Sequence, residues 1–421
     1  MMRNRIKAMI AASVLACSMT ACGTGGTQAA DMTAQLSPQT VAGKTADDEF
    51  QLSQMQFALQ LLEQTLKTCP EDNVLISPYS AMQALAMTAN GASGDTLAEM
   101  EQVLGGIPIE QLNEYLYSYR TSLPETEFCK FQSANSMWIQ DQENRIQMQP
   151  DFLQTVKDYY SAEAFLAPFN GSTVRDINNW GKEHTGGMIP KILKEIPDDA
   201  VLYLINTVMF DGQWEDKYQP EDINKNVPFY PLTGAEQSCS MMCSDEHLYL
   251  SDENACGFMK YYKREDYAFC ALKPLNNLSP QEYLETLDAE KLCSILKNPE
   301  ECEVITGLPE YTCEYDASLV QPLKAMGMEK AFTEQADLSR TTQLTDNPLS
   351  ISEVLQKTQI EVNAEGTKAR VITLDEEVVS CAPSEDAKEV YLNRPFIYMI
   401  IDTQAKLPLF IGTVQSVVSP E

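Results

Sequence analysis

Residues 73–80 read Asn-Val-Leu-Ile-Ser-Pro-Tyr-Ser, a stretch that contains the signals for a strand, a cap and a helix in succession. The first four residues end in an apolar run of strand type. Ser77 suits a helix N-cap, because its hydroxyl can accept from a backbone N–H of the first turn, and Pro78 suits the first helical position. An apolar run from 82 to 87 continues the helix. We therefore expect a short strand that leads directly into a buried helix.

On either side of this stretch, helical patterns dominate the first half of the chain and strand patterns the second. Residues 201–210 form a continuous apolar run, typical of a strand in a sheet that is covered on both faces. There is no regular strand–helix–strand alternation, which favours an α+β fold. We expect helices at 49–68, 96–104, 110–122, 150–160, 176–184, 280–297 and 317–326, and a further strand at 128–138.

Composition excludes one large class of function. The chain of 421 residues has 30 Lys and Arg against 61 Asp and Glu, so it is strongly acidic. Nucleic-acid binding needs basic patches that neutralise phosphates, and we therefore expect no nucleic-acid partner. A hydrophobic fraction of 44% is enough for a real core.

The N-terminus has the features of an export signal. A basic start is followed by an apolar stretch at 8–16 that is too short to span a membrane. Residues 19–22, Met-Thr-Ala-Cys, resemble the lipobox of bacterial lipoproteins, in which the Cys, here Cys22, receives lipid. An ordinary signal peptide is the alternative. We expect a signal peptide at 1–21, a flexible tether at 22–48, one folded domain at 49–421, and an extracellular or cell-surface location with membrane contact only through the lipid.

Three observations argue against a metal site, a cofactor or an enzyme. Cys239, Cys243 and His247 are spaced by four residues and lack the CxxC spacing of zinc sites, so we expect no metal. His184 and His247 are the only histidines, and neither lies in a motif that would make it the base for a nucleophile. No glycine-rich phosphate loop is present. The sequence leaves the redox state of its 12 cysteines open.

Several segments resemble the serpin family, and together they cover nearly everything from residue 49 to 418. This resemblance implies helices packed on a large central mixed β-sheet plus two smaller sheets, with an exposed reactive-centre loop. It also implies a monomeric inhibitor that forms a covalent complex with a target serine protease. The segments are 73–80 with 84–96, 177–189, Asn-Thr-Val-Met-Phe-Asp-Gly-Gln-Trp at 206–214, 390–400 with Asn-Arg-Pro-Phe at 393–396, and 410–414.

The stretch 361–369, Glu-Val-Asn-Ala-Glu-Gly-Thr-Lys-Ala, resembles the family's hinge, the segment where the cut loop begins to enter the central sheet. Glycine lets the backbone turn where a Cβ would obstruct it. Small side chains can slip between neighbouring strands, and the long loop that follows is of the kind that usually has a function. The expected hinge residues are Glu365, Gly366, Thr367, Lys368 and Ala369.

The family's usual spacing from the hinge places the cleaved bond after Ser380, before Cys381. A loop one residue shorter would be cut between Val379 and Ser380, which we prefer, because a valine suits a shallow apolar specificity pocket. A small apolar residue before the cleaved bond indicates an elastase-like or subtilisin-like target protease. A cysteine protease target and a second cut at Leu374 stay open.

The resemblance also assigns a polar cluster beneath the sheet, the shutter, to Ser77, Ser80 and Asn206. In many members a His from the strand before the hinge joins them, whereas Gln356 stands at that position here. An amide can both donate and accept, so a network remains available. It also removes pH sensitivity at that point.

The loop departs from the inhibitory pattern in two ways. Arg370, Val371 and Ile372 are bulky. Because side chains alternate along a strand, an inward Thr367 implies that Asp375 and Glu377 also face inward, where unpaired carboxylates are costly. These features favour the alternative, a non-inhibitory serpin-fold surface binding protein, whereas the small residues of the hinge favour an inhibitor.

Overall fold

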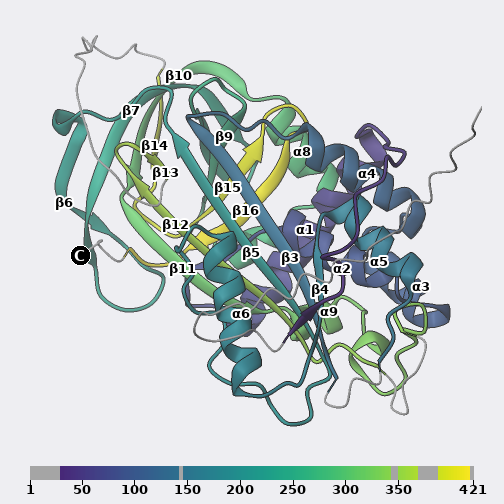
Figure 1. Ribbon diagram of the computed structural model, residues 1–421. Coiled ribbons are helices and arrows are strands. Elements are labelled where there is room, and N and C mark those ends of the chain that lie inside the picture. Colours follow the sequence, from purple (N-terminus) through teal and green to yellow (C-terminus); the bar gives the residue numbers. More distant parts are fainter. Residues whose placement is uncertain (1–28, 142–145, 343–348, 368–386, 418–421) are drawn as a thin grey trace, which may run out of the picture.

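The computed structural model describes residues 29–141, 146–342, 349–367 and 387–417. Helices pack around two large β-sheets, which confirms the predicted α+β class and agrees with the large mixed sheet that the resemblance implied (Figure 1). Several predicted features lie outside the described residues. They are the signal peptide with Cys22, the hinge residues Lys368 and Ala369, and the reactive bond at Val379, Ser380 and Cys381.

The central sheet is mixed and has seven strands. Their order is β1 (Ala30–Asp31), β4 (Glu163–Ala167), β3 (Cys129–Gln140), β5 (Leu202–Gln213), β13 (Gly366–Thr367), β12 (Glu353–Asn363) and β11 (Tyr311–Ser318). Strand β5 runs antiparallel to β3 and parallel to β12. It therefore lies at the centre of the sheet, between the helix-covered strands and the hinge.

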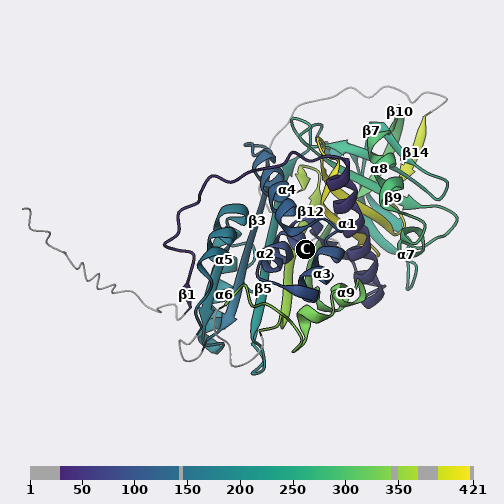
Figure 2. The same ribbon diagram turned by 90° about the vertical axis from the view of Figure 1, so that its right-hand side faces the viewer.

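Both faces of β5 are covered, as its apolar run predicted. Tyr203 and Ile205 pack with α6 (Gly171–His184) in one apolar cluster, whereas Leu202 and Leu204 face the main core. This alternation follows from the two-residue period of a strand. Figure 2 shows the sheet from the side, with α2 beside β3 and β5.

The second sheet has nine strands and joins the two smaller sheets that the resemblance implied. The long strand β7 connects them, because it pairs with β6 over residues 237–242, with β10 over 241–249 and with β8 over 248–251. The strands are β14 (Lys388–Tyr391), β10 (Glu300–Pro309), β7 (Gln237–Ser251), β8 (Ala255–Tyr261), β9 (Tyr267–Pro274), β15 (Phe396–Asp402), β16 (Leu407–Val414) and β2 (Val74–Ile76), with β6 (Ile223–Phe229) beside β7.

The helices begin close to where their caps predict. Ser77 caps α2, accepting from the Ser80 N–H at 3.4 Å. The expected start of α6 at 176 was five residues late, because Asn170 and Thr173 form a capping box that begins the helix earlier. The others are α1 (Asp48–Thr68), α2 (Pro78–Ala89), α3 (Gly94–Val103), α4 (Ile109–Ser122), α5 (Pro150–Thr155) with a π-helical turn at Val156–Tyr160, α7 (Pro280–Leu284), α8 (Ala289–Lys297) and α9 (Val320–Ala325).

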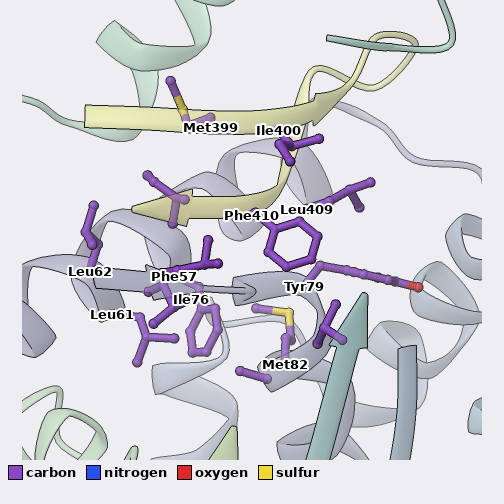
Figure 3. Close-up of a cluster of buried hydrophobic side chains, with 14 of the residues drawn as sticks. Phe57, Leu61, Leu62, Ile76, Tyr79, Met82, Met399, Ile400, Leu409 and Phe410 are labelled. Carbon is purple, nitrogen blue, oxygen red and sulfur yellow. The ribbon is translucent and has the colours of Figure 1, made fainter. Parts of the chain in front are cut away.

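The main core fixes α2 against the second sheet. Side chains of α1, β2, α2, β15 and β16 meet in one buried cluster, and their burial removes a large apolar area from water (Figure 3). This packing therefore fixes the position of the start of α2, which carries the shutter serines. The labelled members are Phe57, Leu61, Leu62, Ile76, Tyr79, Met82, Met399, Ile400, Leu409 and Phe410.

The segment 22–48 was expected to be an unstructured tether, and its described part, 29–47, differs from that expectation. Ala30–Asp31 pairs with β4 as an edge strand of the central sheet. Further on, the Gln39 N–H donates to Asp158 at 2.7 Å. Met32, Leu36 and Ala46 also pack against the core, but apolar residues at these spacings give no sustained helix or strand period, so the arm could not be recognised in the sequence.

Among the helices that the structure describes, none combines the length and the apolar character needed to cross a membrane.

Candidate functional site

The candidate site is the line along which β5 and β12 meet. At one end the two strands pair directly, from Tyr203 opposite Glu353 to Val208 opposite Thr358. At the other end the two hinge residues of β13 lie between them. Thr367 pairs with Gly212 of β5 and with Val362 of β12. The hinge therefore already occupies the first position of an additional strand.

Gln356 joins the closed end of this line to α2. Its Oε1 accepts from the Ser77 N–H at 2.7 Å, and its Nε2 donates to the Ser77 carbonyl and to Asn206 Oδ1, both at 2.9 Å. Gln356 is buried, with only 1% of its surface exposed. The amide thus links β12 to β5 and to the helix beneath them.

Asn206 continues the network on the other side of β5. Its Nδ2 donates to Ser80 Oγ and, at 2.7 Å, to Asn135 Oδ1. The four residues that the sequence assigned to the shutter therefore do lie together. Ser77 contributes its backbone, since its hydroxyl caps α2.

Sequence reasoning missed three members of this shutter network. Asn135 of β3 lies directly opposite Asn206 in the register. Ser133 contacts Ser80, and Gln83 accepts from Asn135 at 3.4 Å. A polar residue inside a buried strand was the signal for Asn135, because buried amides need partners. We use the name shutter network for Ser77, Ser80, Gln83, Ser133, Asn135, Asn206 and Gln356.

The turn before the hinge is held by the segment that follows β5. Trp214 donates its backbone N–H to the Glu365 carbonyl at 3.1 Å and its indole N–H to the Asn363 carbonyl at 2.9 Å. The Tyr218 N–H donates to the Ala364 carbonyl at 3.2 Å. Lys217 forms an ion pair with Glu365 at 2.6 Å. These contacts fix the point from which an inserting strand would start.

Thr367 faces inward, the condition on which the expected direction of Asp375 and Glu377 rests, and it is fully buried. Its hydroxyl lies 2.6 Å from the hydroxyl of Tyr262, whose ring stacks on Trp214 at 4.5 Å. Burial raises the pKa of Tyr262 well above its ordinary value, so the phenol stays protonated. A small polar side chain fits this position, and a charged one would have to be buried.

A buried lysine supports the same aromatic platform and was not anticipated from the sequence. Lys260 is 2% exposed and pairs with Glu246 at 2.6 Å. Its ammonium lies 4.6 Å from the ring centre of Tyr218 and 5.7 Å from that of Trp214. Cation–π contacts and the ion pair together stabilise this buried charge.

Gly366 is required by close packing. A Cβ on this residue would lie 2.0 Å from the Gly212 carbonyl oxygen and 2.9 Å from Gln213 Cα. Both neighbours are backbone atoms that cannot rotate away. The hinge glycine therefore allows two strands to approach at the point where β13 enters the sheet.

The cysteines and histidines form no further site in the described ranges. Cys239, Cys243 and His247 all lie on β7, but no group of three such ligands there could hold a metal ion. The nine cysteines that the structure describes are free thiols. Burial raises the pKa of Cys129 to about 12 and that of Cys239 to about 11, which suppresses their thiolates.

Comparison with known proteins agrees with this fold and site. The family model described as "Serpin (serine protease inhibitor)" matches residues 52–417, and the chain belongs to the serpin family. It is therefore a member of a family of protease inhibitors.

Among curated proteins, leukocyte elastase inhibitor of Bos taurus is 29% identical over 388 residues, which cover 88% of this chain and all of the relative. Among solved structures, the thermophilic serpin tengpin in its native state is 42% identical with a TM-score of 0.88, covering 93% of this chain and 100% of tengpin. Tengpin in its latent state gives 40% identity and a lower TM-score of 0.78, covering 89% and 100%. The arrangement of this chain is thus more similar to the native form.

Replacing Gly366 with alanine should destabilise the hinge. The added Cβ would clash with the backbone of Gly212 and Gln213 in β5, so β13 must either shift or leave its position between β5 and β12. We expect the Gly366→Ala variant to unfold at a temperature several degrees lower, a cost of about 1–3 kcal/mol, measured by differential scanning calorimetry. Gly171→Ala is the matched control, because a Cβ there has no neighbour within 4 Å; equal midpoints for the two variants would contradict the packing argument.

Replacing Gln356 with histidine should make stability depend on pH. At this buried position the Ser77 N–H needs an acceptor, so the imidazole is favoured in its neutral form and its folded pKa falls below the unfolded value of about 6.5. Its contribution to stability is then present above about pH 6.5 and is lost as the pH falls toward the folded pKa. We expect the thermal midpoint of Gln356→His to fall relative to wild type between about pH 7.5 and pH 5.5. A constant difference over this range would show that the network does not select the neutral ring.

Proposed function

We propose that this chain inhibits a serine-type endopeptidase by inserting its cleaved loop into the central sheet. One observation supports this above all. Gly366 and Thr367 already pair with both β5 and β12, at the end of the line where a further strand would enter. Residues that follow Thr367 would extend this strand toward the shutter network.

The proposed chemistry has two steps. The hydroxyl oxygen of the protease serine attacks the carbonyl carbon of the bait residue, the peptide bond breaks, and the amine of the next residue leaves with a proton. The bait residue remains as an ester on the protease. Insertion of the loop then carries the protease along and distorts its active site before water can hydrolyse the ester.

Continuing the register shows how the sheet could accept the new strand. Thr367 lies opposite Gly212 and Val362, so an antiparallel strand without a bulge would bring Thr373 opposite Asn206 and Gln356. These are the two amides whose 2.9 Å hydrogen bond the insertion must break. A threonine hydroxyl both donates and accepts, and it could therefore satisfy both amides in the inserted state.

Before cleavage, the direct pairing of β5 with β12 opposes this change. Six residues of each strand pair with each other, and they must separate before the new strand can pair with both. The native form would then be protected by a barrier, although the inserted form is more stable.

We place the cleaved bond between Val379 and Ser380, with Ser380–Cys381 as the second choice. The valine would occupy a shallow apolar pocket, which suits an elastase-like or subtilisin-like protease. The likeness to leukocyte elastase inhibitor supports this class of target. The partner is one target protease in a covalent complex with a monomer of this chain.

We further propose that the chain is exported. The basic start, the apolar stretch and the cysteine of Met-Thr-Ala-Cys support removal of residues 1–21 and lipidation of Cys22. The lipid would hold the domain at the outer side of a bacterial membrane.

The alternative function is a non-inhibitory surface binding protein. It is favoured by Asp375 and Glu377, which would face inward during insertion. Heat stability separates the two functions, because an inhibitor gains a large stabilisation after its loop is cut and a passive serpin does not.

The first test mixes fragment 31–421 with pancreatic elastase and, separately, with a subtilisin. We expect a band at the summed mass on a denaturing gel, with the cut mapped by mass spectrometry after Val379 or Ser380. Cleavage in the loop without a covalent band, and without a rise in thermal midpoint, would support the passive alternative.

A charged hinge variant should turn the inhibitor into a substrate. Thr367→Arg would bury a guanidinium beside Tyr262, which opposes insertion without altering the bait. We expect complete cleavage and loss of the covalent band. Glu389→Arg places the same side chain at the exposed far base of the loop and should keep the band. Retention of the band by both variants would mean that the hinge does not enter the sheet.

A further inference from the structure

A pocket of about 350 Å³ lies beside the shutter network and has no role in the function proposed above. Its walls come from the start of α2, the end of α4 with the residues after it, β3, and His184 at the end of α6. Pockets of this volume lie in the range that holds small organic ligands. The residues that matter for its chemistry are Tyr79, Arg120, Leu123, Pro124, Glu125 and Phe131.

Arg120 supplies an unused positive charge. In the described ranges of the chain it forms no ion pair, and its Nε is buried without a hydrogen-bond acceptor. Its recorded contact is with the ring of Tyr117, 5.7 Å from the centroid. A buried donor normally has an acceptor, and the buried Nε of this partly exposed arginine is therefore free to take one from a ligand.

Tyr79 offers a second donor on the same wall. Its hydroxyl accepts from Gln83 Nε2 at 2.8 Å and retains its own proton. Burial raises the pKa of Tyr79, and no acceptor for its proton is found within the ranges that the structure describes. Figure 3 shows this hydroxyl pointing away from the apolar cluster.

We propose that this pocket binds a small organic monocarboxylate with an apolar body. The carboxylate accepts from Arg120 and from the Tyr79 hydroxyl, a charge-assisted arrangement. The apolar body lies against Leu123, Pro124 and Phe131. Glu125 is exposed in the pocket wall, and its charge disfavours a ligand with a second acidic group.

The ligand would be coupled to the central sheet. Ser133 also lines the pocket and contacts Ser80, which accepts from Asn206. Strand β3 pairs with β5 along almost its whole length, so β3 must move with β5 when β5 parts from β12. A ligand that bridges α2, α4 and β3 therefore slows loop insertion. Binding itself does not rest on the inhibitory function.

Calorimetric titration of the full chain without protease tests the site. Octanoate and its neutral analogue octanamide are the probes, and Arg120→Met is compared with Arg175→Met. Arg175 is a matched control on α6, where it donates to the Gly171 carbonyl of its own helix at 3.0 Å. We expect one octanoate per chain for wild type and Arg175→Met, and affinity reduced about tenfold or more for Arg120→Met and for octanamide.

Tyr79→Phe keeps the ring and removes the donor, and it should weaken octanoate binding by a few-fold. The proposal is overturned if octanoate does not bind, if octanamide binds equally well, or if Arg120→Met binds as wild type does. Coupling has its own readout with protease present. Saturating octanoate should raise the ratio of cleaved chain to covalent complex in wild type and leave it unchanged in Arg120→Met, and an unchanged wild-type ratio overturns the coupling.

Discussion

The hydrogen bonds of the Gln356 amide are the interaction on which the rest of the structure depends. They join β5 to β12, which pair directly with each other over six residues. They also connect both strands to the first turn of α2. A buried amide that loses a partner costs about 1–3 kcal/mol. The sheet therefore remains closed until something else satisfies Gln356 and Asn206. Because neither group titrates, this closure does not depend on pH.

Strand β5 runs through both ends of the site, the end where it pairs directly with β12 and the end where β13 lies between the two strands. Strand β5 holds Asn206 near its middle, and Gly212 lies close to its end. Trp214 and Lys217, which follow directly, hold the turn that precedes the hinge. A strand is stiff along its length, so displacement at the hinge and displacement at the shutter network are mechanically linked. This linkage explains why a site built from residues distant in sequence can respond as one unit.

What the sequence could predict depended on how local its signals were. The helices at 49–68 and 110–122 follow from periodicity, and Ser77 with Pro78 marks the start of α2 correctly. The arm at 29–47 has no sustained periodicity because it is held by hydrogen bonds and by a few scattered apolar side chains. Asn135 and Lys260 gain their partners only through strand register and packing, which a single sequence does not reveal. Gln356 was identified because a family resemblance supplied the position, and chemistry then showed that an amide could serve there.

How far the cleaved loop could insert would depend on two of its inward-facing positions, Thr373 and Asp375, and on the residues opposite them. An inserted Thr373 would meet Asn206 and Gln356, where a hydroxyl is needed. Two residues further on, Asp375 would meet Leu204 and Val354, which are both buried and apolar. In the proposed mechanism, each step up to the shutter network would add hydrogen bonds on both sides of the new strand, whereas the next inward step would bury a carboxylate beside apolar side chains.

Glu377 would fall opposite Leu202, which is fully buried, and Ser352, which is partly exposed. If the proposed insertion occurs, its largest cost would therefore fall at Asp375, with a further cost at Glu377. A protease attached near Val379 would be pulled across the sheet only if the gain from the earlier steps exceeded these costs. In the proposed mechanism, the balance between Thr373 and these two carboxylates, rather than the hinge alone, would decide between trapping and release.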